Sequence, residues 1–239
     1  MVIAKRARST EQKSARREEI LAAAVTLLKE KPFHRIGIAE IAAQAGMAKG
    51  TVFLYFKTKE ELFFDIASRE FANWFDAMDR LFADLCNSGK KPITADVVNA
   101  LRSILARYPL LPSLSAILHI VLEQNIGYKE ARDFKKTLID RLSRTGALLE
   151  QCLPSLWPGQ GVKFLLWMYG LIIGFTHMAE PAPVVQKIYD KEPGLRKMQI
   201  DFNEHFFDAL ETILDGWKAQ KRGRKSSVRS RQEGRHETV

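Results

Sequence analysis

The chain has 239 residues, of which 46% are hydrophobic and 27% charged, a composition typical of a globular protein and too apolar for a disordered one. Its net charge of +9 is concentrated at the two ends, because residues 1–17 and 218–239 hold 14 Lys or Arg side chains against three Glu. The two cysteines, Cys86 and Cys152, are too few for a disulfide scaffold and lack metal-ligand spacing. They predict a reduced, cytoplasmic protein in which both thiols are buried as small apolar groups.

Neither the N-terminus nor the most apolar run of the chain predicts an export or membrane segment. The first 19 residues lack the apolar core that a signal peptide needs. The longest uncharged run, 164–179, has 16 residues and contains His177, whereas a membrane-crossing helix needs about 20 apolar residues. This run therefore predicts a buried helix, and no membrane partner is expected.

The first predicted helix follows a basic N-terminal arm. Residues 1–15 are rich in Lys and Arg and are expected to be flexible. From Ile20 to Leu28, apolar side chains recur at spacings of three and four, which is typical of one face of an amphipathic helix. Pro32 is expected to end this helix, because proline cannot donate the backbone hydrogen bond that would continue it.

Two short helices and a long one are predicted next. Gly37 precedes "IAEIAAQAGM", a short helix expected to end near Gly46, and a second short helix is expected over 48–53. The long helix is expected to begin after Thr58. Thr58 and Glu61, three residues apart, have the spacing of a capping box, which satisfies free amides at a helix start.

The rest of the chain is also predicted to be helical. Its apolar periodicity, interrupted by the loops "NSGKKP" and "EPAPVV", predicts helices at about 94–107, 111–124, 129–152, 161–178 and 192–218. The basic tail, 219–239, has too few apolar residues to bury a surface and is expected to be disordered. No extended strand alternation and no internal repeat is present, so the fold class is all-α.

The segment from Ile38 to Tyr55 has the residue types of a helix-turn-helix. Ala42 is small where the two short helices would approach each other, and Gly46 lies where the turn needs a positive φ. Val52 is apolar where the second helix would pack back on the first. The second helix is predicted to project four residues outward: Ala48, Lys49, Thr51 and Tyr55.

An ordinary helical hairpin has similar small residues at its turn and is the alternative to this interpretation. Two further observations favour DNA binding. Cations lie beside the turn at Lys49, Lys57 and Lys59, and a basic arm precedes the domain. A helix of this size fits the major groove, so the second helix is predicted to read double-stranded DNA.

Residues 16–63 resemble the N-terminal domain of the TetR family of transcriptional regulators. The matching residues are Ile41-Ala42, Ala45-Gly46-Met47, Lys49-Gly50-Thr51-Val52, Tyr55-Phe56, Lys59 and Leu62. The resemblance covers about a fifth of the chain. It implies a three-helix DNA-binding domain over 16–60, a helical ligand-binding and dimerisation domain over 61–218, and a homodimer that binds operator DNA.

The chain departs from the family pattern at two positions. Phe53 stands where the family usually has a tyrosine whose hydroxyl meets a phosphate, and Gly37 stands where a threonine often caps the helix. Phe53 and Phe56 are expected to pack against the domain, and the role of Leu54 stays open. The resemblance implies base or phosphate contacts for Lys49 and Tyr55 and phosphate contacts for Thr51 and Lys59. The full predicted DNA-binding set is Gly37, Ala48, Lys49, Gly50, Thr51, Tyr55 and Lys59.

The last two helices are expected to form the dimer interface if the family architecture holds. Near the C-terminus, apolar residues recur at spacings of three and four, which suits a four-helix contact between two chains. They are Phe202, Phe206, Leu210, Ile213 and Trp217. The same stripe could instead face the core of its own subunit.

Candidates for an effector pocket are large side chains of the long helices and polar groups embedded among them. They are Phe75, Leu105, Leu118, His119, Glu123, Trp167, Met168, Phe175 and His177. The apolar members could equally be plain core. His119 and Glu123 lie one turn apart, but without a third ligand they predict an intrahelical pair, and no metal or cofactor is predicted.

These patterns predict a ligand-responsive transcriptional regulator, a repressor that a small, mainly apolar effector releases from its operator. An architectural DNA-binding protein without an effector is the first alternative, and steep salt dependence with little sequence preference would identify it. A helical enzyme is the second alternative. It is not favoured, because the chain has no nucleophile elbow, phosphate-binding loop or His-Glu-x-x-His pair.

Overall fold

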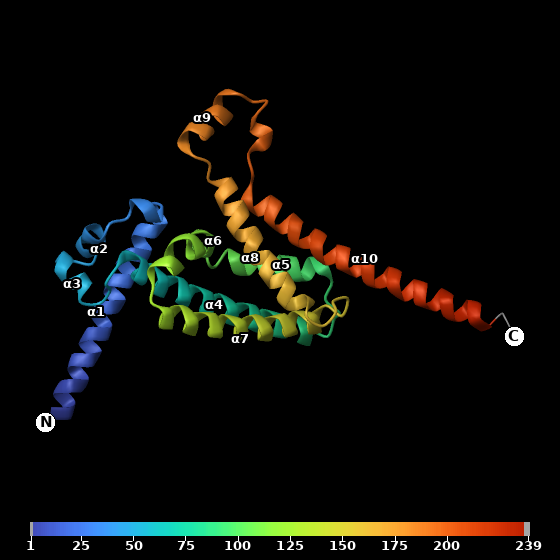
Figure 1. The fold of residues 1–239 in the computed structure, drawn as a ribbon, viewed down its shortest axis with the longest axis horizontal. Coiled ribbons are helices and arrows are strands. Elements are labelled where there is room, and N and C mark those ends of the chain that lie inside the picture. Colours follow the sequence, from blue (N-terminus) through green and yellow to red (C-terminus); the bar gives the residue numbers. More distant parts are fainter. Residues whose placement is uncertain (1, 237–239) are drawn as a thin grey trace. The chain divides into compact units, whose positions relative to one another are not determined.

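The computed structural model describes residues 2–236, with side chains described for 11–223, and all of its regular elements are helices (Figure 1). Within these residues no strand is present, which confirms the all-α prediction. The chain divides into two compact units, residues 1–72 with 113–134 and residues 73–112 with 135–239. Each unit is described separately below.

The first unit holds the predicted helix-turn-helix. Its elements are α1 (Val2–Glu30), η1 (Phe33–Arg35), α2 (Ile38–Gln44), α3 (Lys49–Phe53), the first half of α4 (Lys59–Asn87), α6 (Leu111–Ile117), the π-helical turn η2 (Leu118–Leu122), η3 (Glu123–Asn125) and the start of α7 (Tyr128–Cys152). The apolar stripe of α1 is buried as predicted, with Ile20 and Ala24 fully inaccessible. In the same unit, Leu62 and Phe63 of α4 are also fully buried.

The second unit is a layered helical body. It contains the second half of α4, α5 (Thr94–Leu105), most of α7, α8 (Gln160–Ala179), α9 (Pro183–Lys191), η4 (Arg196–Met198) and α10 (Phe202–His236). Helix α10 packs against both α5 and α8. Its core is aromatic, since Phe82, Phe164, Phe206 and Phe207 are each almost completely buried. α9 and η4 form an excursion between α8 and α10 (Figure 1).

Two glycines let α7 and α8 approach each other closely. A methyl group on Gly161 of α8 would lie 2.0 Å from the carbonyl oxygen of Gly146 on α7. A methyl group on Gly146 would lie 2.7 Å from the backbone nitrogen of Val162. Neither position has room for any side chain, so backbone meets backbone where the two helices cross.

Both predicted flexible ends are helical where the structure describes them. α1 begins at Val2, within the expected arm 1–15, and α10 continues to His236, within the expected tail 219–239; residues 237–239 lie outside the described part. Neither stretch contains proline, and most of their residues are good helix formers. Extending a helix that is already packed costs far less than nucleating one, which explains the difference.

Two internal boundaries also differ from the prediction. The expected single helix 111–124 is divided into α6, η2 and η3, and the expected start of the last helix at 192 is replaced by η4 and a later start at Phe202. In the first case the helix type changes from α to π and then to 3₁₀. Local apolar periodicity does not distinguish these helix types, because all of them return a side chain to the same face within three to five residues.

The two cysteines are joined, contrary to the prediction of free thiols. Cys86, near the end of α4, and Cys152, the last residue of α7, form a disulfide with a Cα–Cα distance of 5.0 Å. Cys152 is buried as expected, with 1% exposure. The pairing joins residues 66 positions apart, so it depends on the packing of α4 against α7, which the spacing of two cysteines does not reveal.

Among the described residues one helix, α8, is long and apolar enough to cross a membrane. Its mean hydropathy over the best 18-residue window is 1.4, and 28% of that window is buried. A single such helix is weak evidence, since a helix inside a globular core passes the same test. Four of its residues belong to the core of the second unit: Phe164, Leu165, Met168 and Ile172.

Candidate nucleic-acid interface

The turn between α2 and α3 has the geometry that the sequence predicts. Gly46 has φ of +65°, a conformation that residues with a side chain rarely adopt. Ala42 and Val52 are 1% and 0% exposed, so the two helices meet at these positions. The amide of Met47 donates to the carbonyl of Ala42 at 2.8 Å, which closes the end of α2. The steric basis of a helix-turn-helix is therefore present.

Contacts with α1 and α4 fix the orientation of this motif. Phe56, just beyond α3, is 1% exposed, and the guanidinium of Arg17 lies 4.8 Å from its ring centroid. Arg17 also pairs with Asp65 of α4 at 2.7 Å. Phe56 is thus a packing residue, as predicted, and one arginine joins α1, the end of α3 and α4.

The start of α4 is capped in part as predicted. Thr58 precedes the helix, and its Oγ1 accepts a hydrogen bond of 3.0 Å from the amide of Glu61. The carboxylate of Glu61 accepts from the amide of Lys57 at 2.7 Å rather than from that of Thr58. Two amides are satisfied, as in a capping box, but the returning bond reaches one residue further back.

The outward face of α3 differs from the prediction at Phe53. This ring is 45% exposed and the neighbouring Leu54 is 76% exposed, although Phe53 was expected to pack inside the domain. Val52 occupies the inward direction, and successive helical residues are rotated by about 100°, so Phe53 cannot point inward as well. The ammonium of Lys49, one turn earlier, lies 6.0 Å from the Phe53 ring centroid. The sequence contained this signal, because Val52 and Phe53 are adjacent in one short helix.

The other predicted DNA-binding residues divide by exposure. Ala48, Lys49, Gly50 and Gly37 are exposed, whereas Thr51 and Tyr55 are half-buried beside them. Gly37 is the N-cap of α2, with no side chain to accept a hydrogen bond, as expected from its identity. The face formed by residues 48–50, 53 and 54 therefore combines one cation, two small residues and two large apolar side chains.

Lys59 lies in a different setting from that of a phosphate contact. Its Nζ donates to the carbonyl oxygens of Phe33 and Ile36, both at 3.1 Å, and lies 3.9 Å from the ring centroid of Phe33. Partial burial lowers the pKa of this ammonium below its ordinary value. Lys59 thereby joins the start of α4 to the segment that leads into α2, and its donors are directed into the domain.

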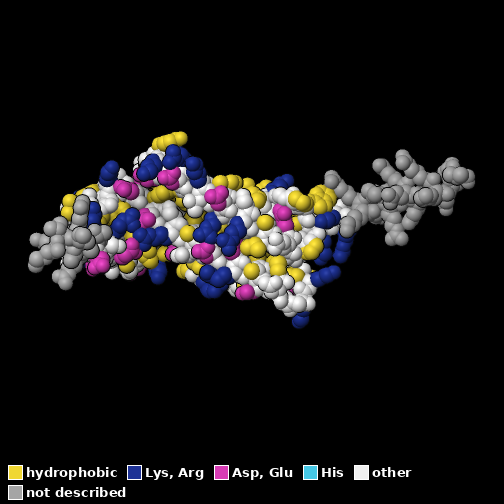
Figure 2. Space-filling view, turned by 90° about the horizontal axis from the view of Figure 1, so that it is seen from below, with side chains coloured by type: hydrophobic (Ala, Val, Ile, Leu, Met, Phe, Trp, Pro, Cys, Tyr) yellow, Lys and Arg dark blue, Asp and Glu magenta, His cyan; other side chains and the backbone are white. Residues whose placement is uncertain are grey.

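Two exposed lysines remain available near α3. Lys49 and Lys57 form no ion pair with any described side chain, whereas Lys31 is paired with Glu40 on α2. That hydrogen-bonded ion pair lowers the pKa of the Glu40 carboxyl. On the face in Figure 2, Lys and Arg side chains are interspersed with Asp and Glu.

The predicted effector residues do not gather around one described cavity. Phe75, Leu105, Leu118 and Met168 are core residues with at most 8% exposure. His119, Trp167 and His177 are exposed, and Glu123 and Phe175 are partly exposed. His119 Nδ1 lies 3.0 Å from Glu123 Oε2, which is the intrahelical pair expected from their spacing. No cluster of metal-binding side chains is found among the described residues.

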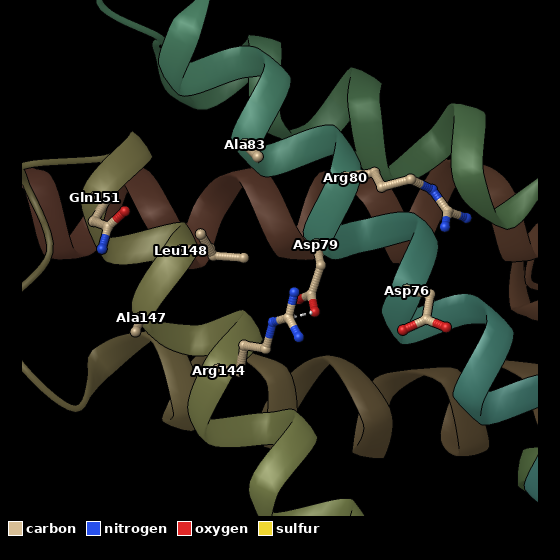
Figure 3. A pocket seen from close by; sticks show the side chains of 8 residues that line it. All are labelled: Asp76, Asp79, Arg80, Ala83, Arg144, Ala147, Leu148 and Gln151. Atoms are coloured by element: carbon tan, nitrogen blue, oxygen red, sulfur yellow. Dashed lines mark ion pairs between the residues drawn. The ribbon is translucent and has the colours of Figure 1, made fainter.

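A cavity of about 470 Å³ lies instead between α4 and α7 in the second unit (Figure 3). It is lined by Asp76, Asp79, Arg80, Ala83, Arg144, Ala147, Leu148 and Gln151. Asp79 is 5% exposed, accepts a hydrogen bond of 2.5 Å from Thr145 Oγ1, and has its other oxygen 2.9 Å from Arg144 Nε. Arg144 reaches from α7 toward Asp79 on α4. Four of the eight lining residues are charged, whereas the sequence suggested a mainly apolar pocket built from other residues.

The predicted dimer stripe faces the core of its own subunit, the alternative that the sequence left open. Phe206, Leu210 and Trp217 are at most 8% exposed, while Phe202 and Ile213 are partly exposed. Trp217 contacts Trp167 of α8 with ring centroids 5.2 Å apart. The stripe is buried because α10 packs against α5 and α8, and periodicity alone cannot tell which partner covers an apolar face.

Two family models match the chain. The model described as "Bacterial regulatory proteins, tetR family" matches residues 20–66, which include α2 and α3. The model described as "Tetracyclin repressor-like, C-terminal domain" matches residues 68–221, more than half of the chain. The two matches adjoin near residue 67.

The chain is also similar to individual known proteins. The fatty acid metabolism regulator protein of Bacillus subtilis is 34% identical over 68 residues, which cover 28% of this chain and 35% of that protein. The match thus spans about a third of that relative's length. The crystal structure of a TetR-family regulator from Mesorhizobium loti covers 86% of this chain and 96% of its own, with 15% identity and a TM-score of 0.52. A structure of FadR from Bacillus subtilis with stearoyl-CoA covers 83% and 98%, with 21% identity and a TM-score of 0.48.

Proposed function

The chain belongs to the TetR family of transcriptional regulators, and we propose that it is a homodimeric repressor released from its operator DNA by a small effector. The observation that carries this proposal is the α2–α3 turn. Gly46 at φ +65° and the buried pair Ala42 and Val52 hold α3 with one face outward. A helix presented in this way fits the major groove, where base edges can be read.

The proposed DNA contacts come from the outward face of α3 and its flanks. Lys49 and Lys57 carry exposed ammonium groups with no ion pair among the described side chains, so no ion pair has to be broken when they bind phosphate. Thr51 and Tyr55 add hydroxyl donors, and Gly37, Ala48 and Gly50 allow the backbone to approach the DNA closely. Lys59 is reassigned in this proposal from a phosphate contact to a residue that positions α4 against η1.

The proposed dimer interface uses the outward faces of α8 and α10 rather than the buried stripe. Gly170 and Gly174 on α8 and Gly216 on α10 are exposed, and a methyl group on any of them would meet nothing within 4 Å. Leu166 and Trp167 on α8 are 50% and 42% exposed. Small residues beside large apolar ones let two helix pairs approach closely, and a two-fold dimer presents two α3 helices to two half-sites.

The proposed effector binds in the helical second unit. The cavity between α4 and α7 supports an effector with at least one polar or charged group, because Asp79, Arg80 and Arg144 line it. For this molecule to release DNA, it must bind the free and DNA-bound conformations with different affinities. Thermal-shift screening of charged metabolites, followed by operator binding with each hit, tests this part of the proposal.

The experiment that tests the main proposal is selection of bound fragments from the source genome, followed by fluorescence anisotropy on the enriched sequence. A regulator binds one short palindrome-like site far more tightly than random DNA, by about 10³-fold or more. An architectural protein would show steep salt dependence without this preference. Uniform binding to all fragments, or no binding, would contradict the proposal.

A further inference from the structure

Two large apolar side chains lie exposed at the end of α3, although the other large apolar side chains of residues 11–72 are buried or half-buried. Phe53 is 45% exposed and Leu54 76% exposed, whereas the rings of Phe33, Phe56 and Phe63 are each at most 9% exposed. The domain therefore has a well-formed aromatic core, and the Phe53 ring lies outside it. An exposed phenylalanine next to an exposed leucine indicates a surface that contacts another molecule.

The setting of these two side chains specifies the kind of partner. Lys49 lies one turn before Phe53, with its ammonium 6.0 Å from the ring centroid, and Lys57 is exposed three residues beyond Leu54. Neither lysine is in an ion pair with a described side chain. An apolar centre flanked by unpaired cations is complementary to a polyanion that presents apolar groups between its charges. Double-stranded DNA has this arrangement, with phosphates on both sides of the groove.

In the major groove the main apolar group is the C5 methyl of thymine. The other base-edge groups there are hydrogen-bond donors and acceptors, which lose water without compensation when a phenyl or isobutyl group covers them. Phe53 also lacks the hydroxyl that would let it turn toward a phosphate. An aromatic ring and a leucine facing the groove are thus best satisfied by thymine methyl groups.

We propose that Phe53 and Leu54 are specificity-determining residues that read thymine methyl groups in each operator half-site. This inference rests on the proposed insertion of α3 into the major groove. The ammonium of Lys49 lies over the Phe53 ring, 6.0 Å from its centroid, and is available to a phosphate or a guanine. Base recognition by this helix is therefore divided between apolar contacts at positions 53 and 54 and polar contacts at position 49.

The test is a methyl-deletion scan of the selected operator. Each thymine in turn is replaced by deoxyuridine, which removes the C5 methyl and leaves every hydrogen-bonding group of the base pair in place. Affinity is measured by fluorescence anisotropy for the wild-type protein and for Phe53→Ala, Leu54→Ala and Phe53→Tyr. At one or two thymines in each half-site, the wild type is expected to lose about fourfold in affinity, the value of one buried methyl group.

Coupling between the loss of a thymine methyl and the truncation of a side chain identifies the contact. At the same thymines, Phe53→Ala or Leu54→Ala should reduce the effect of deoxyuridine to less than about 1.5-fold, since the methyl has lost its partner. Phe53→Tyr adds the hydroxyl that would let the ring turn toward a phosphate, so the effect of deoxyuridine should fall in this variant as well. Ile139→Ala serves as a matched control, because Ile139 is 54% exposed on α7 and is not part of the proposed contact.

The possible outcomes separate this inference from the function on which it rests. If no genomic fragment is bound with sequence preference, the proposed regulator itself is wrong. If an operator is bound tightly but the deoxyuridine scan is flat, or the losses are equal in the wild type and both alanine variants, methyl reading is wrong. Melting temperatures of the variants show that the fold is intact, since exposed positions are expected to change stability by less than about 0.5 kcal/mol.

Discussion

Replacing Lys59 with methionine distinguishes a positioning role from a phosphate contact. The variant keeps the apolar stem over Phe33 but removes the ammonium that donates to the carbonyls of Phe33 and Ile36 at 3.1 Å. Each charge-assisted hydrogen bond is worth about 1.5–3 kcal/mol when shielded from water. Because Lys59 is only partly buried, water satisfies part of the hydrogen bonding that is lost. The free energy of unfolding is therefore expected to fall by about 2 kcal/mol in total.

The assay is thermal unfolding together with the salt dependence of operator binding. A loss of about 2 kcal/mol lowers the melting temperature by roughly 4–8 °C for a chain of this size. The slope of log affinity against log salt should stay unchanged, since no phosphate contact is lost. Lys49→Ala is the matched control, with an unchanged melting temperature and a slope reduced by about 1. An unaltered melting temperature and a reduced slope for Lys59→Met would refute the positioning role.

Three further substitutions test other features of the fold. Gly46→Val should destabilise the first unit by about 2 kcal/mol or more, because a β-branched residue is strained at φ +65°; full stability and DNA binding would contradict the turn assignment. Gly161→Ala should cost more than about 3 kcal/mol, since the added methyl would lie 2.0 Å from a carbonyl oxygen; Gly194→Ala, where nothing lies within 4 Å and which is outside the proposed dimer interface, is its control in denaturant unfolding. Cys86→Ser should lower stability under oxidising conditions by about 4 kcal/mol, the constraint that a closed loop of 66 residues places on the unfolded chain. Reductant should lower the melting temperature of the wild type to that of this variant. Equal melting temperatures of the two proteins without reductant would show that the disulfide does not form.

The sequence predicted the DNA-binding half more accurately than the helical body, and the reason is physical. Ala42, Gly46 and Val52 are local requirements of one turn, so their spacing determines their environment. Phe53 was assigned to packing, although Val52 already occupied the inward direction of the helix. The environment of a short motif is thus predictable when each side chain is placed by rotation along its helix.

Features that depend on distant packing were not predictable in this way. The Cys86–Cys152 bond needs the ends of α4 and α7 to lie together, and the burial of Phe206 needs α5 and α8 to cover α10. The charged cavity likewise arises from the approach of Asp79 on α4 and Arg144 on α7. Each of these features joins different helices that are distant in the chain, and a single sequence does not show which helices become neighbours.

The contact between Gly146 and Gly161 limits how the proposed effector site could be redesigned. A mutant library that varies α7 and α8 uniformly would lose most of its members at these two positions, where even alanine has no room. Randomisation is better confined to side chains that line the cavity, such as Leu148 and Gln151, which lie on α7 beyond the crossing. The crossing of α7 and α8 then stays the same in every variant. A change in ligand binding can therefore be attributed to the varied residues rather than to a shifted helix.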